Sequence, residues 1–409
     1  MKAAILALFV LAGLVEIDAA AIQNQAATTP APAKKAVAPK TAAATKAPAP
    51  QPAAQSKAAP SAKTAAKSVP AKTAVAKKLV YKPAPPVDPT AGDVIDGEDL
   101  TVRRAAVAAL GTMIGAVVAV DPSNGRVLSI VNQKVALRSG FTPCSTIKLV
   151  TALAALSEGI IQRDTPVHLT RATSYTLTTA IAHSNNQYFQ KLGNQLGYER
   201  VTRYARMLGL GEKAGLDIRG EESGAWPDAA PAAGGVGMMT AYGENILMTP
   251  LELAALLSAI ADNGTLYYLQ YPANDDEAER IEPRVKRQLE LSPNGISDVK
   301  TGMRAAVDIG TAHSASYNPD EPILGKTGTC TDFRDSNHMG WFGSFNEVDN
   351  HRLVLVVLLR GTRTVNGPAA SGVAGAIYKK LSEQRYFASA SRPQITVPEI
   401  LSTSICCSR

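Results

Sequence analysis

Residues 145–158 read STIKLVTALAALSE, and this stretch decides the fold. After its first turn almost every residue is apolar, and Gly159 ends the run. An apolar run of this length that stops at a glycine predicts a helix buried in the core. Ser145 opens that helix, so its hydroxyl can face a cleft while a rigid core holds its backbone.

Strand-like patterns flank the helical middle of the sequence. Two apolar runs, 116–120 and 126–131, are joined by the turn residues DPSNG and predict a hairpin. Because strands also recur late in the chain, the sequence predicts a mixed α/β (α+β) fold whose sheet is assembled from distant segments, beside a separate helical lobe. Later strands are expected at 323–331, 340–345 and 353–359, and helices within 174–208 and at 249–261, 297–307 and 369–385.

Three short motifs follow one another along the chain: STIK at 145–148, SNN at 184–186 and KTGT at 326–329. A second set also occurs, SPN at 292–294, SDVK at 297–300 and KTG at 300–302. Context separates the two sets, because 326–329 lies in a strand-like run whereas 300–302 precedes residues that favour helix. Ser297 opens a polar helix and is interpreted as its N-cap.

The first set has the residue types that nucleophilic catalysis needs. Ser145 and Lys148 share one face of a helical turn, so the amine can take the hydroxyl proton. Burial, the positive helix N-terminus and the nearby Lys326 would each lower the pKa of Lys148. Ser184 is expected to relay a proton to a leaving amine, and Asn186 to orient Lys148 and the substrate.

The strand around Lys326 is expected at the edge of the sheet, where an extended peptide can add as a further strand. Gly328 allows close approach there. Lys326, Thr327 and Thr329 can then bind a terminal carboxylate. The backbone N–H groups of Ser145 and Thr329 are expected to form an oxyanion hole.

These three motifs resemble the set shared by penicillin-binding proteins and serine β-lactamases. Longer stretches are similar to the transpeptidase domain of penicillin-binding proteins: 119–125, 208–211 leading to 220–221, 249–254, and Trp341 with Phe342. The resemblance covers residues 98–387. It implies an antiparallel sheet flanked by helices with a helical lobe, and a DD-transpeptidase that attacks D-Ala-D-Ala stem peptides through Ser145. It also implies covalent binding of β-lactam antibiotics such as penicillin, and no cofactor.

The sequence departs from that family at two cysteines. Cys144 stands where the family usually has glycine, and Cys330 where it often has alanine. Each adjoins one expected oxyanion donor, so the two backbones should lie close enough for a disulfide. Some carbapenem-hydrolysing serine β-lactamases join cysteines at the same motif-relative positions. Two buried free thiols are the alternative.

The two ends of the chain have other compositions. Residues 1–21 are typical of a signal peptide, with an uncleaved membrane anchor as the alternative. Residues 22–97 are expected to be a disordered Lys/Pro/Ala-rich linker, because 22–87 hold 11 lysines and no acidic residue. Export argues against nucleic-acid binding by this basic segment. It is expected to be a solvated spacer, with weak attraction to anionic wall or lipid polymers as the alternative. Residues 388–409 are expected to be a polar tail. Cys406 and Cys407 in this tail could form an intermolecular disulfide, form a strained disulfide with each other, or remain free thiols.

Two other functions remain open at this point. A DD-carboxypeptidase or β-lactamase needs a base that activates water, and Glu221 and Glu222 are the nearest acidic candidates in sequence. A β-lactam-sensing or wall-binding module would acylate without turnover. The five histidines are scattered without ligand spacing, so no metal site is expected.

Overall fold

The structure is a computed structural model that describes residues 88, 90–348 and 352–388. The expected signal peptide, the linker up to residue 87 and the tail from residue 389, with Cys406 and Cys407, lie outside the described residues. The description below concerns the unit Tyr81–Arg409. Among the residues described, no helix is long and apolar enough to cross a membrane.

The five-stranded sheet brings the two ends of the domain together. Its order is β2-β1-β9-β8-β7, with every neighbouring pair antiparallel. Strand β1 near the start of the domain pairs with β9 near its end, as Val117 does with Val357. The expected assembly from distant segments is therefore confirmed, and β7 is an edge strand. The strands are β1 Gly115–Val120, β2 Val127–Val131, β7 Ile323–Thr331, β8 His338–Asn346 and β9 Val354–Gly361.

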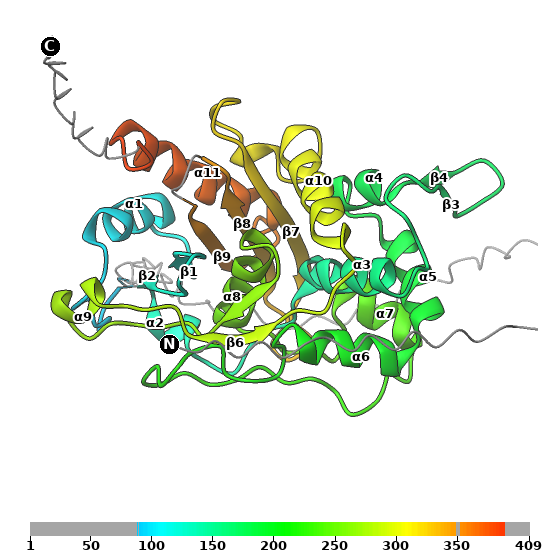
Figure 1. The fold of residues 1–409 in the computed structure, drawn as a ribbon, viewed down its shortest axis with the longest axis horizontal. Helices are drawn as coiled ribbons and strands as arrows, with labels where there is room; N and C mark the ends of the chain where they lie inside the picture. Colours follow the sequence, from blue (N-terminus) through cyan, green and yellow to red (C-terminus); the bar gives the residue numbers. More distant parts are fainter. Residues whose placement is uncertain (1–87, 89, 349–351, 389–409) are drawn as a thin grey trace, which may run out of the picture. The chain divides into compact units, whose positions relative to one another are not determined.

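Both faces of the sheet are covered by helices (Figure 1). Alternate residues of β9 enter two different cores, since side chains of a strand point to opposite faces in turn. Leu355 and Val357 pack in the core that α1 (Leu100–Leu110) and α11 (Gly367–Glu383) share. Val356 and Leu358 pack in the core that contains α8 (Pro250–Ala261).

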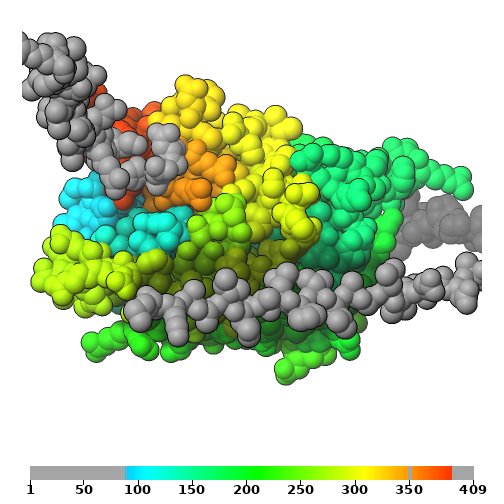
Figure 2. Space-filling model, in the orientation of Figure 1, coloured from blue at the N-terminus to red at the C-terminus, as the bar shows by residue number. Residues whose placement is uncertain are grey.

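The helical lobe lies beside the edge of the sheet, to the right in Figure 1. Helix α3 (Lys148–Ser157) is buried at its centre, which confirms the core helix expected from the opening stretch. Helix α10 (Gly295–Asp308) packs against both α4 and β7. In Figure 2 the yellow region that includes α10 lies between the orange strands and the green lobe. The other lobe helices are α4 Leu177–Ala182, α5 Asn186–Leu196, α6 Tyr198–Met207 and α7 Gly235–Tyr242.

Several smaller elements had no clear signal in the sequence. They are mostly too short to show a period. They are α2 Gln133–Ala136, β3 Val167–His168, β4 Ser174–Tyr175, β5 Thr265–Tyr267, α9 Asp275–Glu279, β6 Val285–Gln288, and the 3₁₀ turns η1 Cys144–Ile147 and η2 His313–Ala315.

Two expectations about boundaries are wrong. Helix α10 begins at Gly295 after Asn294, so Ser297 lies inside its first turn and is not the N-cap. The linker is expected to extend to Gly97, but the side chain of Asp93 is only 2% exposed and is bonded to the domain. Its carboxylate pairs with Arg103 at 2.8 Å and accepts hydrogen bonds from the backbone of Asn132 and Gln133.

Candidate active site

The structure brings the first set of motifs together at the junction of the sheet and the lobe. Ser145 lies in η1, and Lys148 is the first residue of α3. Ser184 lies in the connection between α4 and α5, Asn186 is the first residue of α5, and Lys326 belongs to the edge strand β7. Side chains from four segments of the chain therefore converge on one point.

The amine of Lys148 is at the centre of this cluster. Its Nζ lies 3.0 Å from Ser145 Oγ, 3.1 Å from Ser184 Oγ and 2.5 Å from Asn186 Oδ1. The Ser184 carbonyl oxygen is 2.7 Å away. Lys148 is completely buried, and this burial, followed by repulsion from Lys326, lowers the pKa of Lys148 to about 6. A buried amine with a pKa near 6 is neutral at pH 7 and can accept the proton of Ser145.

Ser184 bridges the two lysines. Its Oγ is 2.8 Å from Lys326 Nζ and 3.1 Å from Lys148 Nζ. The Ser184 backbone adopts φ +53°, a left-handed conformation that costs a non-glycine residue about 1 kcal/mol. This bend separates α4 from α5, whose first turn is capped by the Asn185 side chain through a 2.9 Å bond from the Tyr188 backbone. The lobe thus holds a strained serine in position between the two amines.

Lys326 has the second depressed pKa of the site. It is completely buried, and burial lowers the pKa of its amine to about 7. Its Nζ donates to the Thr327 carbonyl at 2.8 Å as well as to Ser184. The Thr327 hydroxyl meets that of Thr311 at 2.6 Å, and Thr329 Oγ1 accepts from the Gly367 backbone at 2.8 Å. Thr311 was not identified from the sequence, because no motif marks it and its place depends on where α10 ends.

Gly328 brings β7 against the turn that carries Ser145. A Cβ at this position would lie 3.1 Å from the Pro143 carbonyl oxygen and 3.2 Å from Cys144 Cβ. These contacts are tighter than ordinary van der Waals distances. The close approach at Gly328 therefore includes the protein's own turn around Cys144 and Ser145.

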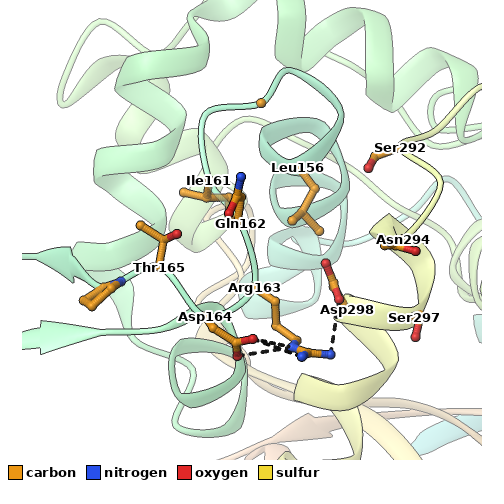
Figure 3. A pocket seen from close by; sticks show the side chains of 12 residues that line it. Leu156, Ile161, Gln162, Arg163, Asp164, Thr165, Ser292, Asn294, Ser297 and Asp298 are labelled. Carbon is orange, nitrogen blue, oxygen red and sulfur yellow. Dashed lines mark hydrogen bonds and ion pairs between the residues drawn. The ribbon is translucent and has the colours of Figure 1, made fainter.

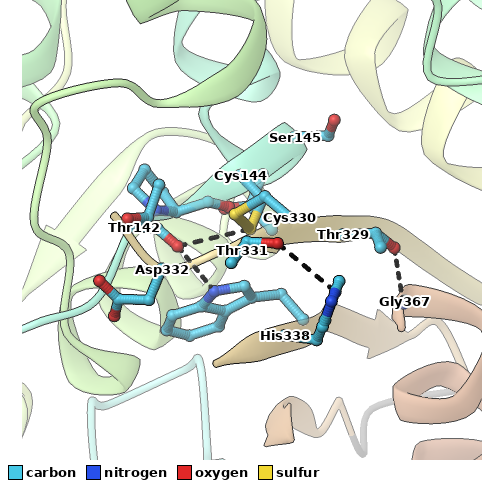
Figure 4. Close-up of a disulfide and its surroundings, with 12 residues drawn as sticks. Thr142, Cys144, Ser145, Thr329, Cys330, Thr331, Asp332, His338 and Gly367 are labelled. Atoms are coloured by element: carbon cyan, nitrogen blue, oxygen red, sulfur yellow. Dashed lines mark hydrogen bonds between the residues drawn. A yellow bond between two sulfur atoms is a disulfide. The ribbon is translucent and has the colours of Figure 1, made fainter. Parts of the chain in front are cut away.

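A disulfide lies directly beside this contact (Figure 4). It joins Cys144 to Cys330, whose Cα atoms are 5.5 Å apart. Cys144 has φ +52°, a conformation that glycine adopts without cost and cysteine does not. The indole of Trp341 supports the same turn by donating to the Thr142 carbonyl at 2.9 Å.

The second set of motifs is not brought together. Ser292, Asn294 and Ser297 line a separate hollow of about 900 Å³ between α10 and the end of α3 (Figure 3). Lys300 is turned away toward Asn263 and Glu347. Gly302 has a packing role, because a Cβ there would lie 2.7 Å from Ile181 Cδ1 of α4.

Other candidates also have structural partners. Glu221 accepts hydrogen bonds from the backbone of Ala214 and Gly215, and Glu222 from that of Ser139. Among the described residues, no group of His, Cys, Asp and Glu side chains could hold a metal ion.

Comparison with known proteins matches the same region. The model of the family described as penicillin binding protein transpeptidase domain matches residues 115–383. Stage V sporulation protein D of Bacillus subtilis is 26% identical over 311 residues, which cover 64% of this chain and 48% of that protein. Peptidoglycan D,D-transpeptidase MrdA of Acinetobacter baumannii is 25% identical over 303 residues, which cover 59% and 45%. The chain thus spans about half the length of these relatives.

A solved structure has the same fold. The crystal structure of Pseudomonas aeruginosa PBP2 in complex with WCK 5153 aligns with a TM-score of 0.59 at 24% identity. The alignment covers 71% of this chain and 77% of that one.

Proposed function

The chain belongs to the penicillin-binding protein transpeptidase family, and from this premise we propose that it is a serine D,D-transpeptidase acting on D-Ala-D-Ala stem peptides in peptidoglycan cross-linking. Family membership confirms the resemblance seen in the three motifs, and the antiparallel sheet with its helical lobe confirms the expected fold class. The observation that carries the proposal is the buried Lys148 amine, 3.0 Å from Ser145 Oγ.

Acylation follows from this contact. Ser145 Oγ attacks the carbonyl between the two D-alanines, and its proton passes to Lys148 Nζ. The backbone N–H groups of Ser145 and Thr329 stabilise the oxyanion that forms. The C–N bond then breaks, and the leaving D-alanine takes its proton from Lys148 through the Ser184 hydroxyl. The product is an ester on Ser145.

The second step regenerates the serine. An amine of a neighbouring stem peptide attacks the ester, loses a proton to Lys148 and forms the new amide, while Ser145 recovers its proton. Lys326, Thr327 and Thr329 bind the terminal carboxylate of the donor peptide, and Asn186 orients Lys148. Penicillin enters by the same first step, because its strained amide carbonyl takes the position of the peptide carbonyl. We also propose that residues 1–21 direct export of the protein. The linker at residues 22–97 then lets the folded domain reach the cell wall at some distance from the membrane.

The contacts of the acidic residues bear on the hydrolase alternative. Glu221 and Glu222 hold backbone N–H groups, and neither is bonded to the Lys148 cluster. A β-lactamase would need another group to activate water, whereas transfer to an amine needs only the cluster already described. This difference favours the transpeptidase.

A fluorescent penicillin tests the proposal on the purified full-length chain. We expect covalent label that persists for many minutes, and its loss in Ser145→Ala. Ser297→Ala is the matched control, because Ser297 is the first residue of the S-x-x-K motif in the second set. This variant should leave labelling nearly unchanged. Labelling that survives in Ser145→Ala would refute the nucleophile assignment. Loss of label within seconds would instead favour a β-lactamase.

A further inference from the structure

Three arginines line a hollow of about 260 Å³ that is separate from the Lys148 cluster. Arg138 lies between α2 and η1, Arg334 lies between β7 and β8, and Arg360 lies near the end of β9. Asp335 is the one carboxylate in the lining. We call this site the arginine hollow, and its composition suits an anion.

Two of the arginines are held in place by the ring of Phe141, which also lines the hollow. The guanidinium carbon of Arg360 lies 4.8 Å from the ring centre, and that of Arg334 lies 5.6 Å from it. Arg334 also donates a hydrogen bond to the Gly140 carbonyl at 2.8 Å. Guanidinium groups stack on aromatic rings in this way. Both groups are therefore positioned before any ligand binds.

The arginines keep hydrogen-bond donors that the neighbouring carboxylates do not use. Arg334 pairs with Asp332 at 3.2 Å, and Arg360 pairs with Asp335. Within the described part of the chain, Nη1 of both arginines has no partner, and neither has the buried Nε of Arg360. The exposed side chain of Arg138 makes no hydrogen bond or ion pair there. Free donors therefore remain on all three segments.

A phosphate group fits these donors better than a carboxylate does. A carboxylate presents two oxygens in one plane, which a single guanidinium fork can hold. A tetrahedral phosphate presents oxygens in several directions, so arginines from three segments can bind it together. The other carboxylate nearby, that of Glu222, accepts from the Ser139 backbone at 2.9 Å and is not bonded to Arg138.

Exposed apolar side chains beside two of the arginines indicate how the phosphate is carried. Ile114 is 66% exposed, and its carbonyl accepts a hydrogen bond from the Arg360 backbone at 2.8 Å. The antiparallel register of β1 and β9 places these two residues opposite each other, with their side chains on one face. Phe333 is 58% exposed, and its ring centre lies 6.0 Å from the guanidinium carbon of Arg334. Cationic groups beside exposed apolar side chains match the surface of an anionic membrane.

We propose that the arginine hollow binds the phosphate of an anionic lipid headgroup, with Ile114 and Phe333 in contact with the membrane surface. The contact holds the end of β9 that carries Arg360 against the membrane. It uses none of the side chains of the Lys148 cluster, so it does not depend on the proposed function.

Quenching by brominated lipid tests this contact in the full-length chain. The readout must be local, because the lysines of residues 22–87 also attract anionic lipid. Ile114→Trp reports on the rim of the hollow, and Ile309→Trp at the end of α10, where Ile309 is 69% exposed, is the matched control. The two native tryptophans are buried and give both variants the same background.

Vesicles of brominated phosphatidylglycerol and phosphatidylcholine should quench Ile114→Trp much more strongly than Ile309→Trp. Inorganic phosphate, added at constant ionic strength, should reduce this quenching because it competes for the hollow. Equal quenching of the two variants would overturn the proposal. Quenching that inorganic phosphate does not reduce would also overturn it, since the contact would then need no phosphate site.

Arg138→Gln, combined with Ile114→Trp, should weaken vesicle binding about fivefold, because an arginine near an anionic membrane surface contributes roughly 1 kcal/mol. Arg171→Gln removes the same charge between β3 and β4, at the right of Figure 1, and should leave binding unchanged. Equal effects of the two variants would overturn the assignment to the hollow. A rise in unfolding temperature with inorganic phosphate, without any quenching by vesicles, would overturn the lipid and indicate a soluble phosphate.

Discussion

Lys148 and Lys326 share one hydroxyl, and this arrangement sets the protonation of the site. Both amines are buried and both reach Ser184 Oγ, so two positive charges there would repel each other with little solvent screening. The pKa of Lys148 falls to about 6 and that of Lys326 to about 7. Near pH 7, Lys148 is therefore the neutral amine that a base requires, and Lys326 carries more of the positive charge that a carboxylate would bind.

The depressed pKa of Lys148 predicts how acylation depends on pH. Protonated Lys148 cannot accept the Ser145 proton, so the second-order rate of penicillin acylation should rise as pH increases through about 6. Lys326→Met removes the repelling charge and should move this rise to higher pH. Stopped-flow labelling between pH 4.5 and 8 measures both effects.

Lys148→Ala provides the control for that profile. It should lower the rate by roughly 10² to 10⁴ and abolish the rise near pH 6. A rise that persists without Lys148 would assign it to another group. A rate loss smaller than about tenfold would argue against Lys148 as the base.

The sequence predicted a residue's place in the site only where the residue belonged to one of the three motifs. Ser145, Lys148, Ser184, Asn186 and Lys326 were identified from residue type and spacing, and the structure brings them together. Thr311 was missed, because its place depends on where α10 ends, and that feature has no local sequence signal.

The contact between β7 and η1 governs the site at the scale of elements. Gly328 lets the strand approach the turn that carries Ser145, and the disulfide between Cys144 and Cys330 joins the same two elements. Gly328→Ala should separate them by a few tenths of an ångström. Because catalytic geometry tolerates little displacement, we expect at least a tenfold loss in acylation rate. Stopped-flow penicillin labelling measures this loss, and thermal unfolding should show only a small change.

Gly372→Ala is the matched control for Gly328→Ala. Gly372 lies in α11, where an added Cβ would meet only Ser314 Cβ at 3.8 Å. Alanine is favoured over glycine in a helix, so this variant should keep full acylation and gain slightly in stability. An unchanged rate in Gly328→Ala would mean that the turn and the strand can move apart without consequence.

The elements themselves were predicted unevenly. The long strands and the buried helices have clear periods, and β1, β7 and α3 lie where the sequence indicated. The helical pattern of 174–208 did not predict the break at residues 183–185. Ser184 ends one helix with a left-handed backbone conformation, and the Asn185 side chain caps the next helix. Helix α1 was missed at the start of the segment assigned to the domain.

At the scale of the whole molecule, the sheet joins segments that are far apart in sequence. Strand β1 lies between β2 and β9, and the lobe is inserted between the hairpin and the late strands. The turn that carries Ser145 comes from the first part of the domain, and β7 comes from the last part. The position of this turn relative to β7 therefore depends on every element between them, unless a covalent bond joins the turn to the strand.

The bond between Cys144 and Cys330 supplies that link across a sequence separation of 186 residues. A cross-link over so long a loop restricts the unfolded chain strongly, and on the chain-entropy model it stabilises the fold by about 5 kcal/mol.

We expect the double variant Cys144→Ala, Cys330→Ala to unfold at a clearly lower urea concentration. We also expect it to acylate more slowly, because η1 is then held to β7 by packing alone. Cys406→Ser with Cys407→Ser is the control and should leave the urea midpoint unchanged. Peptide mapping of the non-reduced protein checks the premise directly, and recovery of Cys144 and Cys330 as alkylated free thiols would refute it.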